Sequence, residues 1–207
     1  MDVDKKSKII ACIPAFNEEK TIASVVVQAR KYVDRVVVCD DGSVDLTGEI
    51  AEALGAVVVR HEENMGYGAA IISLFKEARR LCADIAVTLD GDGQHDPRQI
   101  PRLVEPLVRN EADIVIGSRF LRREDSSKVP RYRAVGLKMI TGLTSNASYD
   151  NLTDAQSGFR AYSCRSLEVL MVTEQGMGVS TEILLKANER GLRVVEVPVT
   201  ISYRKDS

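Results

Sequence analysis

Short apolar runs alternate with longer amphipathic stretches along the chain up to Gly117. The runs are rich in Val and Ile and have the length of β-strands, and they predict strands at Lys8–Ile13, Arg35–Cys39, Ala56–Arg60, Asp84–Leu89 and Asp113–Gly117. Apolar side chains recur with helical spacing between these runs, and they predict helices at Glu19–Tyr32, Leu46–Leu54, Gly68–Leu81 and Pro97–Asn110. Because strands and helices alternate, the pattern predicts an α/β fold with a mostly parallel central sheet flanked by helices.

The pattern changes after the fifth predicted strand. Seven basic side chains lie within residues 119–138, namely Arg119, Arg122, Arg123, Lys128, Arg131, Arg133 and Lys138. Pro130 then opens an amphipathic segment at Arg131–Ala147, which fits either a helix at a membrane surface or a helix of the core. The last predicted elements are a helix at Ser180–Arg190, ended by Gly191, and a strand at Val194–Ser202. Since no repeat or linker separates these elements, the chain is expected to form a single domain.

Overall charge and cysteine pattern narrow the function classes. The 207 residues carry a formal net charge of −2, so nucleic acid is not an expected partner, and attraction to a membrane must come from a local patch. The four cysteines form no Cys-x-x-Cys pair, and three lie in apolar runs, where they are expected to be buried and reduced. No signal peptide precedes the domain and no run of about 18 apolar residues occurs, so a cytoplasmic protein is expected.

Polar motifs follow four of the predicted strands at the point where each strand ends. They are Pro14-Ala-Phe-Asn-Glu-Glu19, Asp40-Asp41-Gly42-Ser43, Asp90-Gly91-Asp92-Gly93-Gln94-His95 and Gly117-Ser118-Arg119. In open α/β sheets the ligand binds outside the carboxyl ends of the strands. The sequence therefore predicts one site built from all four motifs.

The motif after the fourth strand has the chemistry of a metal site. Asp90 and Asp92 alternate along an extended segment, and the glycines between them let a ligand come close. Two carboxylates and the Gln94 amide oxygen are hard ligands that suit Mg²⁺ or Mn²⁺, with substrate phosphate oxygens completing the shell. The alternative is an Asp-Gly turn between strand and helix. His95 is expected to be a polar contact of the loop rather than a ligand.

Two further motifs predict contacts to a nucleotide. The carboxylates of Asp40 and Asp41 can accept hydrogen bonds from a base imide or a ribose hydroxyl, while Ser43 or Asp45 caps the helix that follows. Asn64-Met-Gly66-Tyr-Gly68 precedes a predicted helix, whose N-terminal amides and dipole favour a phosphate. The Gly-x-Gly-x-x-Gly fingerprint does not follow the first strand, so a dehydrogenase is not expected.

The ordered set of motifs resembles glycosyltransferase family 2, whose members have the GT-A fold with a Rossmann-like nucleotide-binding half. The motifs above are joined by Gly117-Ser-Arg-Phe120, Asp154-Ala-Gln-Ser-Gly-Phe-Arg160 and Val195-Glu-Val-Pro198, so the resemblance covers nearly the whole chain. Within the family, the Asp-x-Asp-x-Gln and Ser-Gly-Phe-Arg forms are most similar to dolichyl-phosphate mannose synthases and related polyprenyl-phosphate hexosyltransferases.

The resemblance implies an inverting enzyme that moves a hexose from a UDP- or GDP-sugar to a polyprenyl phosphate, such as dolichyl phosphate, at the cytoplasmic face of a membrane. It implies a nucleoside site made by Pro14, Phe16, Glu18 and Asp41. It implies that a metal and the donor diphosphate are held by Asp90, Asp92 and Gln94. The acceptor phosphate is then approached by Arg119, Arg131 and Arg160. Asp154 occupies the place of a carboxylate on the acceptor side.

Several alternatives stay open at this point. A sugar hydroxyl acceptor requires a general base, and Asp154 is either that base or the partner that orients Arg160 or Arg131 through a salt bridge. A sugar nucleotidyltransferase is also metal-dependent, but it would carry a Gly-rich, Lys-bearing loop near the first strand, and this motif is absent here. A non-catalytic module that binds nucleotide-sugars or membrane lipid is the third alternative. The family usually continues into a basic segment and membrane-associated helices, and Tyr203-Arg204-Lys205 begins such a segment.

Overall fold

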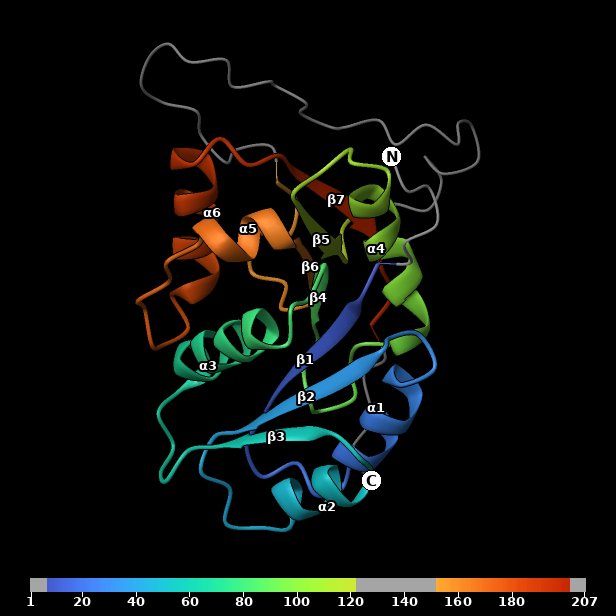
Figure 1. Ribbon diagram of the computed structural model, residues 1–207, viewed down its shortest axis with the longest axis vertical. Helices are drawn as coiled ribbons and strands as arrows, with labels where there is room; N and C mark the ends of the chain where they lie inside the picture. The colour runs from blue at the N-terminus through green and yellow to red at the C-terminus, as the bar shows by residue number, and fades with distance from the viewer. Residues whose placement is uncertain (1–6, 122–151, 202–207) are drawn as a thin grey trace.

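The computed structural model describes residues 7–121 and 152–201 and places them in a seven-stranded sheet with helices on both faces (Figure 1). The strand order is β3-β2-β1-β4-β6-β5-β7. The strands are β1 (Ile9–Ala15), β2 (Arg35–Asp40), β3 (Val57–Arg60), β4 (Ile85–Thr88), β5 (Ile114–Ser118), β6 (Arg160–Ser163) and β7 (Val194–Pro198). All run parallel except β6, which is antiparallel to both neighbours. The predicted α/β class and mostly parallel sheet are confirmed.

Alternating side chains divide the core into two layers. In β1, Ala11 and Ile13 face one layer while Ile10 and Cys12 face the other, because successive side chains of a strand point to opposite faces. The first layer is covered by α1 (Ile22–Ala29), α2 (Thr47–Ala53) and α4 (Ile100–Val108). The second layer is covered by α3 (Tyr67–Arg80), α5 (Cys164–Val169) and α6 (Val179–Glu189), on the other side of the sheet (Figure 1).

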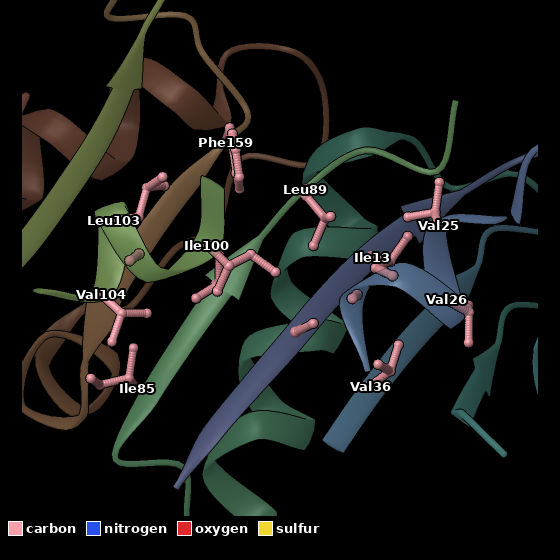
Figure 2. Close-up of a cluster of buried hydrophobic side chains, with 14 of the residues drawn as sticks. Ile13, Val25, Val26, Val36, Ile85, Leu89, Ile100, Leu103, Val104 and Phe159 are labelled. Carbon is pink, nitrogen blue, oxygen red and sulfur yellow. The ribbon is translucent and has the colours of Figure 1, made fainter. Parts of the chain in front are cut away.

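The first layer includes residues that lie next to the polar loops. Figure 2 shows Ile13 of β1 and Leu89, just after β4, in the same buried cluster as Ile100 of α4. Phe159 belongs to this cluster although it lies in the loop before β6, and it is fully buried. Full burial of such a side chain contributes about 1.5–3 kcal/mol. This packing fastens the loops after β4 and before β6 to the rigid sheet, so their polar residues are held in place.

Element bounds agree with the predicted bounds to within a few residues, with three differences. The helix predicted at Pro97–Asn110 begins as a 3-10 turn, η1 (Pro97–Gln99), where the Asp96 carboxylate accepts the Arg98 amide proton. β7 ends at Pro198 rather than Ser202, because proline has no N–H for the ladder. β6 and α5 were not predicted, because Arg-Ala-Tyr-Ser is short and has no apolar run.

Two other expectations have different outcomes. Cys12 and Cys39 are buried, but Cys82 and Cys164 are exposed, so two cysteines rather than three are core residues, and all four are free thiols. Arg131, the segment Arg131–Ala147 and most of the basic run lie outside the described residues. Among the residues that the structure describes, no helix is long and apolar enough to cross a membrane.

The topology brings distant loops to one edge of the sheet. β1, β2, β4 and β5 point the same way, so their carboxyl ends share that edge. β6 runs in the opposite direction and therefore begins at this edge, with Arg160 paired to Thr88 at the end of β4. The single antiparallel strand thus delivers residues 152–159 to the place where the predicted motifs meet.

Candidate active site

A pocket of about 340 Å³ opens at this edge of the sheet. Its walls contain seven of the residues predicted from the sequence, namely Pro14, Phe16, Glu18, Asp41, Gly66, Asp90 and Asp92. Other wall residues had no predicted role and come from α3, the loop before β6 and the region of α6, namely Tyr67, Ala70, Gln156, Gly158, Met177 and Ser180. The motifs after β1, β2 and β4 therefore converge on one cavity.

Asp90 presents a carboxylate oxygen that is buried without a hydrogen-bond partner, its Oδ1. The Asp90 amide donates to Nδ1 of His95 over 3.1 Å, so His95 is a contact of the loop, as the sequence indicated. The His95 ring is buried and stacks on Phe159, with ring centroids 5.0 Å apart. Burial raises the pKa of Asp90, while the His95 ring opposes that rise and Asp92 adds to it.

These features fit a divalent cation. A buried carboxylate oxygen without a partner is unfavourable, and a bound cation would relieve it. Asp90 and Asp92 supply hard oxygen ligands of the kind that Mg²⁺ and Mn²⁺ take, together with phosphate oxygens and water. Among residues 7–121 and 152–201, no three His, Cys, Asp or Glu side chains form a metal cage of their own.

Gln94, the third predicted metal ligand, has a different contact in the structure. Its side chain is exposed and does not contribute to the pocket wall. The backbone N–H of Gln94 donates to Oδ1 of Asp92 over 2.8 Å. The observed contact of Gln94 therefore orients the Asp92 carboxylate.

The loop after β1 forms the wall at Pro14, Phe16 and Glu18. Phe16 is 44% exposed, which leaves an aromatic face open to a planar base. The Glu18 carboxylate accepts the Thr21 hydroxyl proton over 2.7 Å at the start of α1. Burial raises the pKa of Glu18; the Thr21 bond opposes the rise, and the charge of Asp92 adds to it.

The loop after β2 holds this wall in place. Ser43 Oγ accepts the Asn17 amide proton over 3.0 Å, and Thr47 Oγ1 accepts the Glu18 amide proton over 2.7 Å. Asp45 accepts the Thr47 amide proton over 3.0 Å, but the residue at the N-cap of α2 is Leu46, so neither Ser43 nor Asp45 is the cap that the sequence predicted. The hydroxyl groups of the Asp-Asp-Gly-Ser-x-Asp-x-Thr motif thus bind the first loop.

Asp41 occupies the N-terminal end of α3. Its carboxylate accepts the amide protons of Met65 over 3.0 Å and Gly66 over 2.9 Å, and it pairs with Nδ1 of His61 at 2.5 Å. The sequence had placed a phosphate at the start of this helix; the amides of Met65 and Gly66 are bound by Asp41 instead, and a phosphate contact elsewhere at this helix end stays a prediction. A carboxylate of the protein already lies at the positive end of the helix dipole. Gly66 still lines the pocket, but its amide binds Asp41.

The glycines around the start of α3 admit a close backbone contact. A Cβ atom on Gly68 would overlap the Glu174 carbonyl oxygen, and one on Gly66 would lie 2.9 Å from the Gln175 carbonyl oxygen. The Gln175 carbonyl also accepts the Ala69 amide proton over 3.1 Å. Residues 173–178, here called the strap, therefore pack against the helix terminus and carry Met177 into the pocket wall.

Asp154 and Arg119 form a bidentate ion pair beside the carboxyl end of β5. Nε and Nη2 of Arg119 each donate to a different Asp154 oxygen over 2.7 Å, and the Arg119 amide donates over 3.0 Å. Burial would raise the pKa of Asp154, but the hydrogen bonds and charge of Arg119 bring it below its usual value. A carboxylate held in this way is suited to positioning an arginine rather than to accepting a proton.

Arg160 is a core residue in the structure and not part of the pocket wall. It is 1% exposed, and its guanidinium donates to the carbonyl oxygens of Ala155, Ser157 and Ser180. These bonds hold the loop before β6 against the start of α6. The direct phosphate contact expected of Arg160 is therefore not the contact observed, and Arg160 is not the partner that Asp154 orients here. Arg131, the other predicted partner, lies outside the described residues.

Tyr67 is a wall residue that the sequence analysis missed. A Cβ atom on Gly158 would lie 2.8 Å from the Tyr67 hydroxyl and 3.0 Å from Oδ1 of Asp90, so Gly158 leaves room for both groups. Burial raises the pKa of Tyr67, which keeps the phenol protonated beside the Asp90 carboxylate. Its one sequence signal was its place between the two glycines of Asn-x-Gly-x-Gly.

Comparisons with known proteins show the family of the chain. The chain matches the family described as Glycosyl transferase family 2 over residues 10–171. It is 34% identical to a UDP-N-acetylglucosamine–dolichyl-phosphate N-acetylglucosaminyltransferase of Methanococcus voltae, over 96% of this chain and 87% of that protein. It is 31% identical to an undecaprenyl-phosphate mannosyltransferase of Micrococcus luteus, over 96% of this chain and 85% of that protein.

Solved structures of glucosyl-3-phosphoglycerate synthase from Mycobacterium tuberculosis are similar as well. A complex of that enzyme with Mn²⁺, UDP-glucose and phosphoglyceric acid matches with a TM-score of 0.70 and 27% identity, covering 97% of this chain and 73% of that chain. A complex with Mg²⁺ and UDP matches with a TM-score of 0.71 and 25% identity over the same shares. The motifs, the sheet topology and these matches lead to one assignment: the chain is a glycosyltransferase with the GT-A fold and belongs to glycosyl transferase family 2.

Proposed function

We propose that this protein transfers a hexose from a UDP- or GDP-sugar to a polyprenyl phosphate, with inversion at the anomeric carbon. The observation that carries the proposal is the pocket with Asp90 and Asp92 in its wall, together with the Arg119–Asp154 pair at the carboxyl end of β5, on the same edge of the sheet. The relatives named for dolichyl phosphate and undecaprenyl phosphate support the acceptor class. The mycobacterial complexes with UDP and Mn²⁺ or Mg²⁺ support the donor class and the metal.

On the donor side, each wall of the pocket has a task in this proposal. Phe16 and Pro14 pack against the base, and Asp41 and Glu18 offer carboxylate oxygens to the nucleoside. Asp90 and Asp92 hold Mg²⁺ or Mn²⁺ next to the diphosphate. The cation, when bound, stabilises negative charge on the leaving diphosphate.

On the acceptor side, the chemistry favours a phosphate over a sugar hydroxyl. A phosphate is already ionised at neutral pH, so its oxygen can form the bond to the anomeric carbon while the bond to the diphosphate breaks, and no base is required. A hydroxyl acceptor would need a general base. Asp154, the candidate base, is bound to Arg119 and has a lowered pKa. In the proposal Asp154 orients Arg119, and Arg119 and Arg131 attract the acceptor phosphate.

The two other interpretations have weaker support. The family match favours glycosyl transfer over nucleotidyl transfer, and the two reactions release different products. Glycosyl transfer releases a nucleoside diphosphate, whereas nucleotidyl transfer releases pyrophosphate. Against a purely binding module stands the family match, together with Asp90 and Asp92 in the pocket wall, whose oxygens would hold a metal in this proposal.

The test is a transfer assay with a polyprenyl phosphate in detergent, Mg²⁺ or Mn²⁺, and a panel of UDP- and GDP-sugars. We expect one donor to give lipid-linked sugar and nucleoside diphosphate in equal amounts. Asp92→Ala or EDTA should lower the rate by about a thousandfold, the scale of losing a main electrostatic contact to the leaving group. The control is Glu52→Ala, an exposed carboxylate that pairs with Arg60 and does not line the pocket.

Three results would decide between the interpretations. Pyrophosphate as product would replace the proposal by nucleotidyl transfer. Nucleoside diphosphate with transfer only to a sugar hydroxyl would retain the donor side and reject the acceptor. Unchanged donor in the presence of every acceptor, with no metal-dependent nucleotide binding, would reject the catalytic proposal as a whole.

A further inference from the structure

Glu196 lies within β7 and directs its carboxylate to the loop before β6. Oε1 accepts the amide protons of Thr153 over 3.0 Å and Asp154 over 2.8 Å. Oε2 accepts the Thr153 amide proton over 2.9 Å and its hydroxyl proton over 3.1 Å. Both oxygens of one side chain thus bind two consecutive residues that lie far away in the sequence.

The same two residues are tied to the end of β5. The Thr153 hydroxyl lies 2.5 Å from Oγ of Ser118, and Ser118 Oγ in turn accepts the Phe120 amide proton over 3.2 Å. Asp154 binds Arg119 through three hydrogen bonds. The Thr153–Asp154 turn is therefore bound by β7 through Glu196. The same turn also binds residues 118–120 at the carboxyl end of β5.

The register of the sheet explains why Glu196 can do this. β5 and β7 are parallel, with Ile116 opposite Glu196 and Ser118 opposite Pro198. Val195 and Val197 pack into the layer covered by α1, α2 and α4, so Glu196 between them points to the other face. A carboxylate only accepts hydrogen bonds, and it is met here by two N–H groups and one hydroxyl, which makes the chemical match complete.

We propose that Glu196 is a positioning residue for the acceptor side of the site: its carboxylate fixes the Thr153–Asp154 turn, and that turn fixes Arg119. The inference rests on the proposed function in that Arg119 attracts the acceptor phosphate. Glu196 contributes no atom to the pocket wall and acts through Asp154. Its removal frees the turn, and the Arg119 guanidinium then loses the single orientation in which it meets a phosphate.

A matched control lies at the opposite end of β5: Asp113 directly precedes this strand, whereas Arg119 directly follows it. Asp113 accepts the amide proton, the Nε proton and an Nη2 proton of Arg193, the same three donors that Asp154 receives from Arg119. It is also buried, and its pKa is lowered: burial opposes the shift and Arg193 produces it. Asp113→Asn therefore disturbs an equivalent ion pair away from the pocket.

The experiment compares Glu196→Gln and Glu196→Ala with Asp113→Asn. For each variant we would measure thermal stability, donor affinity, and kcat and KM for a short water-soluble isoprenyl phosphate. Glu196→Ala should raise the acceptor KM by about tenfold or more, since small misplacements of a positioning group have effects of that order, and leave donor affinity unchanged. Glu196→Gln retains one acceptor oxygen and should have a smaller effect. Asp113→Asn should lower stability without changing the acceptor KM.

A double-mutant cycle shows whether Glu196 acts through Arg119. In an Arg119→Lys background, Glu196→Ala should add little to the acceptor KM, because both changes remove the same contact. Full additivity would overturn the inference. So would an acceptor KM that Glu196→Ala leaves unchanged, or one that Asp113→Asn raises to the same extent.

A readout without substrate separates this inference from the proposed function. The Nε–H resonance of Arg119, assigned by its loss in Arg119→Lys, should exchange with water about tenfold faster in Glu196→Ala than in the wild type, because the ion pair opens more often. Unchanged exchange would overturn the positioning role whatever the acceptor is. Faster exchange in Glu196→Ala, combined with a wild-type protein that transfers no sugar to isoprenyl phosphates, would retain the positioning role and reject only the acceptor.

Discussion

Asp154 is the residue whose neighbours decide its chemistry. Its two oxygens accept three hydrogen bonds from Arg119, and it is 3% exposed. Charge-assisted, bidentate bonds of this kind favour the ionised carboxylate strongly, which is the physical reason for its lowered pKa. Asp154 could accept a proton from a substrate only after the Arg119 guanidinium had moved away from it.

The prediction for this residue is that Asp154→Asn weakens acceptor binding more than it slows the chemical step. The asparagine side chain retains one acceptor oxygen but loses the negative charge. Its NH₂ group then faces an N–H donor of Arg119, with which it cannot form a hydrogen bond. The acceptor KM should rise on the order of tenfold, with a smaller fall in kcat, in steady-state assays at saturating donor. Asp113→Asn serves again as the control. A near-complete loss of kcat at an unchanged KM would instead identify Asp154 as a base.

At the scale of elements, the strap is held by the same kind of contact as the loop before β6. Glu182 of α6 accepts the Thr173 hydroxyl proton over 2.7 Å and the Glu174 amide proton over 2.8 Å. It also pairs with Lys186 at 2.8 Å. Burial alone would raise the pKa of Glu182, but the Lys186 bond and the strap donors lower it to about 2. Two segments beside the site are thus each fastened by one glutamate on a neighbouring element.

The strap gives a prediction about pH. The pKa of Glu182 is lowered on folding from 4.5 to about 2, so its stabilisation is present above pH 4.5 and is lost as the pH falls toward 2. Glu182→Gln should lower the unfolding free energy at neutral pH by on the order of 1–2 kcal/mol, after allowance for solvent screening. Near pH 2 the variant and the wild type should be equally stable.

Chemical denaturation across this pH range measures the difference between the two proteins. Glu52→Gln is the control, because Glu52 is 63% exposed and its pair with Arg60 lies in solvent. If the unfolding free energies of Glu182→Gln and the wild type differed by the same amount from neutral to acid pH, the carboxylate charge would not be what stabilises the strap.

At the scale of the whole molecule, the proposed acceptor is a membrane lipid and the protein carries a net charge of −2. A global field therefore cannot bring the protein to an anionic surface. Seven basic residues lie within 119–138, directly after β5 in the sequence, and are the local positive charge that the sequence offers for this purpose. We propose peripheral association with the cytoplasmic face of a membrane on this basis.

Vesicle flotation tests the membrane proposal. The protein should float with vesicles that contain anionic lipid at low salt, and the bound fraction should fall as salt screens the charges. Arg131→Ala combined with Arg133→Ala should reduce binding. The control combines Lys31→Ala and Lys76→Ala and should leave binding unchanged. Both lysines are exposed; Lys31 follows α1, and Lys76 lies in α3. Equal binding by both double variants would reject the basic run as the attachment site.

Local pattern was sufficient for much of this protein. Apolar runs and helical spacing predicted six of the strands and most of the helices, because the spacing of apolar residues within each element reflects the face that it buries. The Asp-x-Asp carboxylates and the loop after β1 were placed correctly in one site, because parallel strands bring their carboxyl ends together. The order of the motifs was enough for the family, which the comparisons confirmed.

Tertiary structure decided what depends on residues far apart in the chain. The antiparallel insertion of β6 brings Asp154 to Arg119, and the pairing of β7 with β5 brings Glu196 to Thr153 and Asp154. Asp41 takes the helix terminus that a phosphate was expected to use, and Arg160 turns into the core. Periodicity records which face a residue presents but not which distant group it meets. The elements and the acidic motifs of the pocket were therefore determined by the sequence alone, whereas the partners of the charged side chains were decided only by the packed fold.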